Sequence, residues 1–132
     1  MSVVLDSSAM LALLYKEDGA AEVAAELASG SCYAHAVNLC EVFYDFLRTY
    51  DDPRAQQAVV DLGAMGVRCR RDLDDEFWQA AGRLKAAYKR VSLADCFCAV
   101  LASRLGFELI TSDRHEMEPL ASAGVCRVRF IR

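Results

Sequence analysis

Four short stretches of this sequence place a carboxylate directly after an apolar run or inside one. Asp6 follows the run VVL, and Asp113 lies in the stretch LITSDR. Glu41 lies in NLCEV, and Asp95 lies in SLADC. Burying an unpaired carboxylate is energetically costly, so each placement indicates a helix cap, a charged partner or a bound cation.

Each acid taken singly also has an ordinary structural interpretation. Asp6 and Asp113 could cap helices that follow strands. Asp95 lies three residues after Ser92, where an acid completes a capping box at the positive end of a helix. Glu41 has no such capping role, although it could be a solvated helix residue.

Alternating short strands and amphipathic helices must position these acids. The expected strands are Ser2–Asp6, Cys32–Ala34, Val67–Arg70, Glu108–Thr111 and Cys126–Ile131. The expected helices are Ser8–Tyr15, Ala20–Ala28, Val37–Tyr50, one that follows Asp52-Pro53 with Asp52 as its cap, Asp72–Lys89, Leu93–Leu105 and His115–Ala123. This order predicts a single α/β domain over residues 1–132, with a mainly parallel five-stranded sheet covered by helices on both faces.

The predicted sheet gathers the acids at one edge. Ligands of such sheets bind outside the carboxyl ends of the strands, where the winding reverses, and Asp6 and Asp113 each end a strand. Glu41 and Asp95 lie near helix starts that can face the same edge. Two carboxylates about 4 Å apart repel by roughly 4 kcal/mol at an effective dielectric constant of about 20. Four converging acids therefore need a cation, and all-oxygen ligands favour Mg²⁺ or Mn²⁺ over Zn²⁺.

The four stretches, in this order, resemble the motifs of the PIN-domain ribonucleases, and most closely those of the VapC toxins of bacterial toxin–antitoxin pairs. VVLDSSAMLALL, NLCEVFYDFL, SLADCFCAVLA and LITSDRHEMEPL carry the resemblance, which covers essentially the whole chain. It implies a three-layer PIN-like fold and a magnesium- or manganese-dependent endoribonuclease whose catalytic acids are Asp6, Glu41, Asp95 and Asp113. It also implies a homodimer and a small antitoxin that covers the acidic site.

The chemistry expected of such a site is metal-assisted hydrolysis of RNA, in which a water attacks the phosphodiester in line. Asp6, Asp95 and Asp113 are expected to contact metal, and Glu41 to bind metal or hold a metal-bound water. Three supporting residues are expected beside these acids. Ser7 and Ser112 could donate hydrogen bonds to a carboxylate or a phosphate, or they could cap helices. Asn38 could orient Glu41, or it could cap a helix. His115 could contact the substrate, but a histidine in the first turn of a helix is more often simply exposed. Glu116 could bind the metal, but a glutamate at this position more often faces solvent or interacts with the helix dipole.

The composition of the chain indicates in which compartment such a protein would act. The chain has 132 residues, 55% hydrophobic and 26% charged, with no apolar run near the roughly 20 residues that span a bilayer. The N-terminus lacks the basic start of a signal peptide, so a cytoplasmic protein without membrane attachment is expected. The net charge of −4 argues against a simple basic nucleic-acid coat. The six cysteines form no CxxC pair and are expected to be free thiols.

Two groups of residues could contact partners. The basic residues of the RCRR stretch (68–71), with Arg83, Lys85, Lys89 and Arg90, could bind phosphates or be solvated surface charge. Six apolar residues of early helices exceed what a small monomer needs and could form an interface, although core packing explains part of the excess: Met10, Leu14, Phe43, Phe46, Leu47 and Tyr50.

Three alternative functions stay open. A magnesium-binding receiver domain also groups acids at the carboxyl edge, but it needs an acid pair after the first strand and a lysine after the last, and Asp6 stands alone here. A nucleotide-binding domain is disfavoured because no glycine-rich loop follows the first strand. A catalytically inactive PIN fold that only binds an antitoxin is disfavoured because all four acids are present.

Overall fold

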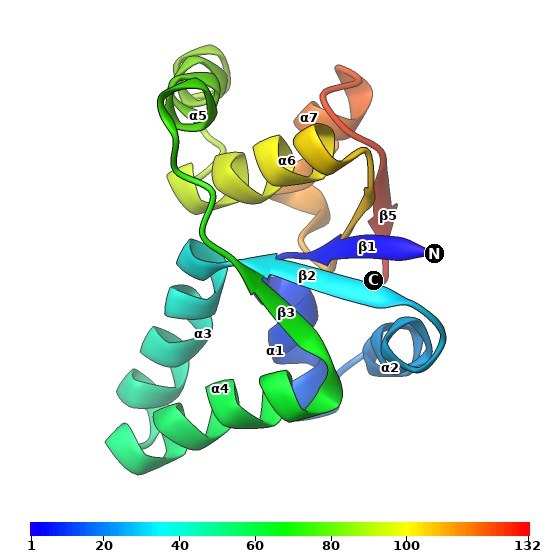
Figure 1. The fold of residues 1–132 in the computed structure, drawn as a ribbon, viewed down its shortest axis with the longest axis vertical. Coiled ribbons are helices and arrows are strands. Elements are labelled where there is room, and N and C mark those ends of the chain that lie inside the picture. Colours follow the sequence, from blue (N-terminus) through cyan, green and yellow to red (C-terminus); the bar gives the residue numbers. More distant parts are fainter.

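Five parallel strands form the central sheet of the computed structural model, which describes residues 1–132 (Figure 1). In chain order the elements are β1 (Ser2–Leu5), α1 (Ser7–Tyr15), α2 (Ala20–Ser29), β2 (Ser31–His35), α3 (Ala36–Thr49), α4 (Asp52–Met65), β3 (Val67–Arg70), α5 (Asp75–Ala87), α6 (Leu93–Leu105), β4 (Glu108–Thr111), α7 (Arg114–Ser122) and β5 (Val128–Phe130). The predicted five-stranded α/β fold is confirmed.

The sheet has the strand order β3-β2-β1-β4-β5. Helices α1 to α4 cover one face and α5 to α7 cover the other, which gives three layers (Figure 1). The winding reverses between β1 and β4, so the carboxyl ends of these two neighbouring strands border the crevice where ligands of such sheets bind. A receiver domain has the order 2-1-3-4-5, and this strand order excludes that alternative.

Each strand of the sheet interior contributes to two separate cores. Val3 and Leu5 pack in the core beneath α1 to α4, and Val4, which points to the opposite face, packs in the core beneath α5 to α7. This alternation follows from the two-residue period of a strand. Because helices cover both faces of the sheet, Val3, Val4 and Leu5 of β1 are all apolar. The first charged residue, Asp6, directly follows the strand.

Five predicted helix starts differ from the structure by one to three residues, and for α4 and α5 the difference has a clear physical reason. Asp51, not Asp52, caps α4, because its carboxylate accepts a hydrogen bond from the Arg54 N–H at 2.9 Å. The helix predicted from Asp72 to Lys89 extends only from Asp75 to Ala87. At its start, Asp72 is held in the preceding loop by ion pairs, and these outweigh its ability to extend the helix.

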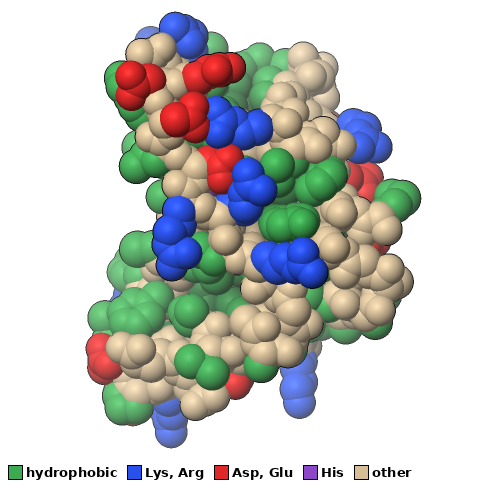
Figure 2. Space-filling view, in the orientation of Figure 1, with side chains coloured by type: hydrophobic (Ala, Val, Ile, Leu, Met, Phe, Trp, Pro, Cys, Tyr) green, Lys and Arg blue, Asp and Glu red, His purple; other side chains and the backbone are tan.

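That loop, between β3 and α5, carries an ion-pair network. The Asp72 carboxylate accepts hydrogen bonds from Arg70 at 2.9 and 3.0 Å and from Arg104 at 3.1 Å, and Arg104 also binds Asp74 at 2.6 and 2.8 Å. Figure 2 shows acidic and basic side chains gathered together on this face of the molecule. The hydrogen bond from Arg70 and then that from Arg104 lower the pKa of Asp72 to about 2. Arg70, one of the basic residues considered for phosphate binding, is therefore engaged within the protein.

Three further predictions concern the cysteines, membrane attachment and the apolar residues of the early helices. All six cysteines are free, as predicted. Cys32 and His35 lie on opposite faces of β2. None of the helices combines the length and apolar character that crossing a bilayer demands. Met10 is fully buried and cannot form an interface, because it points into the core beneath the sheet rather than to the helix surface. Leu47 and Tyr50, by contrast, are 43% and 46% exposed.

Candidate active site

Asp6 lies at the carboxyl end of β1 and caps α1. One carboxylate oxygen accepts hydrogen bonds from the Ala9 N–H at 2.9 Å and the Ser8 hydroxyl at 2.7 Å, and the other accepts from the Thr111 hydroxyl at 2.5 Å. Only 1% of the residue is exposed. Burial raises the pKa of Asp6 to about 6, although the three hydrogen bonds oppose that rise. The carboxylate is thus fixed in place but destabilised in its charged form.

Ser8 and Thr111 tie the ends of β1 and β4 together. The Ser8 hydroxyl accepts from the Ser112 N–H at 2.9 Å and lies 3.2 Å from the Thr111 hydroxyl, which in turn accepts from the Asp113 N–H at 2.9 Å. Neither residue was predicted to support the site. The predicted Ser7 makes no side-chain hydrogen bond, and Ser112 contributes only its backbone N–H. Both missed residues lie inside the quoted stretches, but which hydroxyl faces the acid depends on the geometry of the strand-to-helix turn.

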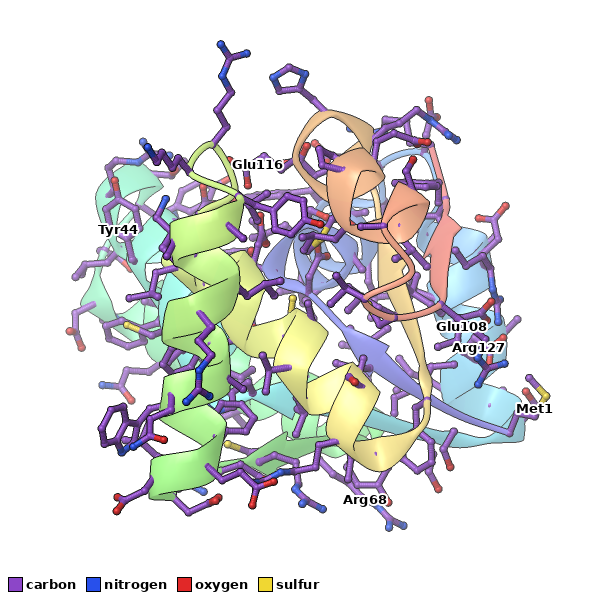
Figure 3. All side chains as sticks on the ribbon, turned by 90° about the horizontal axis from the view of Figure 1, so that it is seen from above. Met1, Tyr44, Arg68, Glu108, Glu116 and Arg127 are labelled. Carbon is purple, nitrogen blue, oxygen red and sulfur yellow. The ribbon has the colours of Figure 1, made fainter.

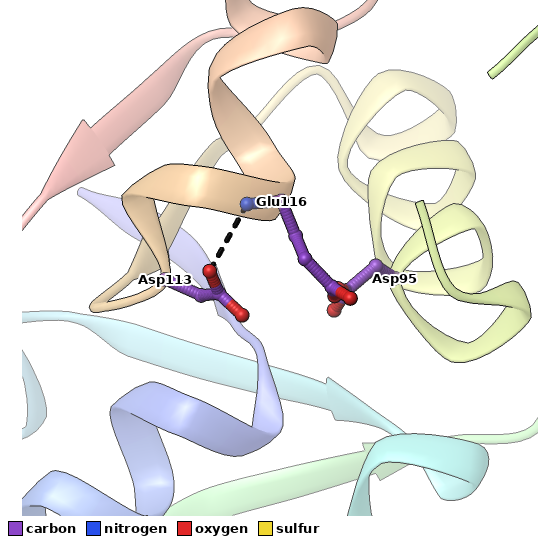
Figure 4. Close-up of side chains that lie close together, drawn as sticks. All are labelled: Asp95, Asp113 and Glu116. Atoms are coloured by element: carbon purple, nitrogen blue, oxygen red, sulfur yellow. Dashed lines mark hydrogen bonds between the residues drawn. The ribbon is translucent and has the colours of Figure 1, made fainter. Parts of the chain in front are cut away.

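Three carboxylates form a close cluster at this edge. Asp95, Asp113 and Glu116 each bring one oxygen within 4.8 Å of the others. Figure 4 shows Asp95 on α6 and Glu116 on α7 pointing toward each other, with Asp113 beside them. Asp113 also caps α7, because its carboxylate accepts a hydrogen bond from the Glu116 N–H at 3.0 Å. Glu116, which fitted a solvent-facing residue better from the sequence, is therefore part of the cluster.

Asp95 has the most perturbed carboxyl group of the cluster. It is 5% exposed, and burial followed by its hydrogen bond with Glu116 raises the pKa of Asp95 to about 9. The charges of Asp6, Glu116 and Glu41 contribute to this rise, and the charge of Asp113 likewise raises the pKa of Asp6. All four predicted acids therefore share one electrostatic environment. Without a cation, the raised pKa keeps the Asp95 carboxyl group protonated at neutral pH.

Glu41 reaches this environment from α3 through Asn38. The Asn38 amide nitrogen donates to the Glu41 carboxylate at 3.4 Å and to the Ala94 carbonyl at 3.2 Å, so it links α3 to the start of α6. Asn38 is fully buried, and its amide oxygen has no hydrogen-bond partner. Such a group costs about 1–3 kcal/mol. The bond to Glu41 is the one expected of a residue that orients it, although Glu41 itself lies outside the close cluster.

The helix starts explain how caps and cluster coincide. Asp6 caps α1, Asp113 caps α7, and Asp95 lies in the first turn of α6, where its N–H is bonded to the Ser92 hydroxyl at 3.1 Å. The positive ends of three helices therefore face the acids and stabilise negative charge there. The capping interpretation is confirmed for Asp6 and Asp113, whose carboxylates cap α1 and α7. The Asp95 side chain makes no capping hydrogen bond, and the catalytic role of these acids stays a prediction.

The donor set fits a hard divalent cation. All groups of the close cluster are carboxylate oxygens, which Mg²⁺ and Mn²⁺ prefer. No histidine competes, because His115 is exposed and His35 is used in the fold. The His35 ring caps α3 through the Val37 N–H at 3.1 Å, donates to the Asp72 carbonyl at 2.8 Å and stacks on Phe77. A cation would offset the cost of burial and the charge repulsion that raise the pKa values of Asp6 and Asp95.

Fold and site together define an α/β domain with an acidic cluster at its topological switch point. The family model of the PIN domain matches residues 3–120, and the chain belongs to this family. A search of curated proteins finds no significant match.

Solved structures with the same fold come from bacterial toxin–antitoxin systems. VapBC2 of Rickettsia felis bound to a DNA fragment from its promoter is similar with a TM-score of 0.75 at 12% identity, and all of both chains is covered. DNA-bound VapBC of Salmonella typhimurium has a TM-score of 0.75 at 17% identity, with 100% of this chain and 99% of that chain covered. VapC20 of Mycobacterium tuberculosis, described as a toxin that cleaves the sarcin-ricin loop, has a TM-score of 0.70 at 17% identity, with 89% and 94% covered.

Proposed function

We propose that this chain is a magnesium- or manganese-dependent endoribonuclease that hydrolyses RNA phosphodiester bonds in the cytoplasm as the toxin of a toxin–antitoxin pair. The observation that carries the proposal is the approach of three carboxylates within 4.8 Å of one another at the switch point of the sheet. Membership of the PIN family supports a nuclease. The description of the similar VapC20 as a toxin that cleaves the sarcin-ricin loop supports RNA as the substrate.

The acids take different parts in this proposal. Asp95, Asp113 and Glu116 would hold the cation, Asp6 would complete its ligands, and Glu41 would bind it directly or through water. When bound, the cation activates a water and offsets charge on the phosphodiester. Thr111 and Ser8 keep the Asp6 carboxylate fixed, and Asn38 keeps Glu41 beside α6. Asp95 would give up its proton when the cation binds, because a metal ligand must be ionised.

RNA cleavage with and without metal tests the proposal. A labelled RNA should be cut in Mg²⁺ or Mn²⁺ and left intact in EDTA. Removing a residue that hydrogen-bonds a metal ligand typically lowers metal affinity or activity by about 10–100-fold. Asp6→Asn and Glu116→Gln change proposed ligands themselves, so each should lower the cleavage rate by at least about 100-fold. Glu118→Gln is a matched control on the same helix, because this glutamate is 54% exposed and its closest cationic partner, Arg114, is 3.8 Å away. Full activity in EDTA, or equal rates for Asp6→Asn and wild type, would contradict the proposal.

We further propose two protein partners, a cognate antitoxin and a second copy of this chain. Several of the similar structures are toxin–antitoxin complexes, which supports an antitoxin that covers the acidic site. Tyr44 and Leu47 of α3 and Tyr50 at its C-cap are exposed, and a dimer would remove such apolar surface from water.

Expression from the native operon should copurify a small protein that inhibits cleavage, and light scattering should show a dimer. A monomer at tens of micromolar with no copurified protein would count against both partners.

A further inference from the structure

The basic residues of the chain divide into those that the fold uses and those that it leaves free. Arg70 and Arg104 bind Asp72, and Arg129 binds Glu26 and Glu108. Lys89 and Arg90 differ: both are exposed, and neither side chain has a hydrogen bond or a carboxylate partner. In a chain with more acidic than basic residues, two adjacent unpaired cations are available to bind an external anion.

The turn that carries these two cations borders the two helices that bear Asp95 and Glu116. This turn, residues 88–91, connects α5 to Ser92, the cap of the helix that carries Asp95. A small cleft of about 210 Å³ is lined by the residues of this turn together with Pro119 of α7. Pro119 follows Glu116 by three residues, so both lie on neighbouring positions of one helix face. The turn therefore borders α7, the helix that begins at the cap Asp113 and carries Glu116.

The fold holds this turn rigidly. The Lys85 ammonium, at the end of α5, donates to the Lys89 carbonyl at 2.7 Å and to the Val91 carbonyl at 2.8 Å. The Val91 N–H donates to the Tyr88 carbonyl at 3.0 Å, and the Val91 side chain is 1% exposed. Lys85 is thus a structural lysine rather than a phosphate ligand. Because the backbone is fixed at both ends, Lys89 and Arg90 lose little backbone entropy when they bind a ligand.

The electrostatics of the site require such a group. The acidic cluster and the net charge of −4 repel a polyanion, so a nucleic acid needs cations beside the cluster to approach it. Lysine and arginine bound to phosphates provide this attraction and position the strand. A rigid dicationic turn that borders the helices of the cluster fits a phosphate next to the one that reacts.

We propose that the Lys89–Arg90 turn binds the RNA backbone at a phosphate flanking the scissile phosphodiester, an inference that rests on the proposed ribonuclease function. The two side chains position the strand so that the neighbouring phosphodiester lies at the acidic cluster. They take no part in the hydrolysis itself.

The salt dependence of RNA binding tests the inference. Binding of a labelled single-stranded RNA is measured by fluorescence anisotropy in Mg²⁺ with the Asp6→Asn protein, which leaves the RNA uncut. Each phosphate that the protein neutralises contributes about 0.7 to the slope of log K against log salt concentration for a single strand. The added changes Lys89→Gln and Arg90→Gln should lower the slope by about 0.7 for each phosphate that is no longer neutralised, and they should weaken binding.

A control with the same loss of charge uses Arg68→Gln with Arg127→Gln. Both arginines are exposed, and Figure 3 shows them away from Glu116. This control should change the slope little. Equal slopes for the two double variants would overturn the inference while wild-type cleavage in Mg²⁺ still upheld the proposed function. Failure of wild type to cleave RNA and of Asp6→Asn to bind it would overturn both.

Discussion

At the scale of single residues, the protonation of Asp95 beside Glu116 should control the affinity of the site for a cation. Burial and the shared hydrogen bond raise the pKa of Asp95 to about 9, so its carboxyl group is protonated at pH 7 in the metal-free protein. A cation requires ionised ligands and must displace that proton. The proton on Asp95 therefore removes one negative charge from the metal-free cluster.

Metal affinity should consequently rise with pH between about 7 and 9, because less work is then needed to remove the proton from Asp95. Calorimetric titration with Mg²⁺ in buffers of different ionisation enthalpy should show release of about one proton per cation at pH 7. Glu116→Gln should release less, because Gln lacks the charge that raises the pKa of Asp95. Binding without proton release, and with pH-independent affinity, would show that the Asp95 carboxyl is already ionised.

At the scale of elements, helix starts and loops decide where the acids lie. The Asp72 network joins the end of β3 to the start of α5 and to α6, the helix that carries Asp95. The Asp72 side chain is 10% exposed, so its ion pairs are screened less than surface pairs. Its lowered pKa, about 2, makes this junction sensitive to acid.

Asp72→Asn should therefore destabilise the protein by about 1–2 kcal/mol at pH 7, since one pKa unit corresponds to about 1.4 kcal/mol. A carboxylate with a depressed folded-state pKa stabilises the protein above its unfolded pKa, and this contribution is lost as pH falls from about 4 toward 2. Urea unfolding of wild type and variant should thus differ at pH 7 and converge near pH 2. Asp75→Asn, an exposed acid of the same loop and helix start, serves as the control. A difference that persists undiminished in acid would point to a packing defect instead.

At the scale of the whole molecule, the ionised acidic site opposes folding, and a bound cation would offset this cost. The folded-state pKa values of Asp6 and Asp95 are both raised, so their contributions to stability are present at low pH and are lost as pH rises through about 6 and about 9. The helix ends and hydroxyl groups around the site reduce this cost but do not remove it. Stability and function therefore place opposite demands on the same residues.

Asp113→Asn should melt at the same or a higher temperature than wild type in EDTA, because Asn retains the cap of α7 while it removes one repelling charge. Magnesium at about a hundredfold excess over Kd should stabilise wild type by about 2.7 kcal/mol, and the variant should lose most of that gain. Thermal melts of both proteins, each with EDTA and with Mg²⁺, provide the measurement. Equal metal-induced shifts would mean that Asp113 is only a helix cap.

The α/β architecture and the candidate acids could be predicted from the sequence. Continuous apolar strands such as Val3–Leu5 and Leu109–Ile110 predict a parallel sheet covered on both faces, because polar residues would otherwise alternate with apolar ones. Asp6 and Asp113 could be placed at the carboxyl edge because each closely follows a strand. These inferences depend only on local periodicity and on residues near one another in the chain.

The groups that complete the acidic cluster could not be predicted from the sequence, because their positions depend on side-chain direction and on contacts between residues distant in the chain. Thr111 reaches Asp6 across 105 residues of chain, and Ser8 rather than Ser7 faces it. Glu116 joins Asp95 because α7 packs against α6. Lys85 binds backbone carbonyls while Lys89 stays free, a distinction that follows from the path of the turn and not from charge pattern. Among residues with the same functional groups, packing therefore determines which ones contact each other.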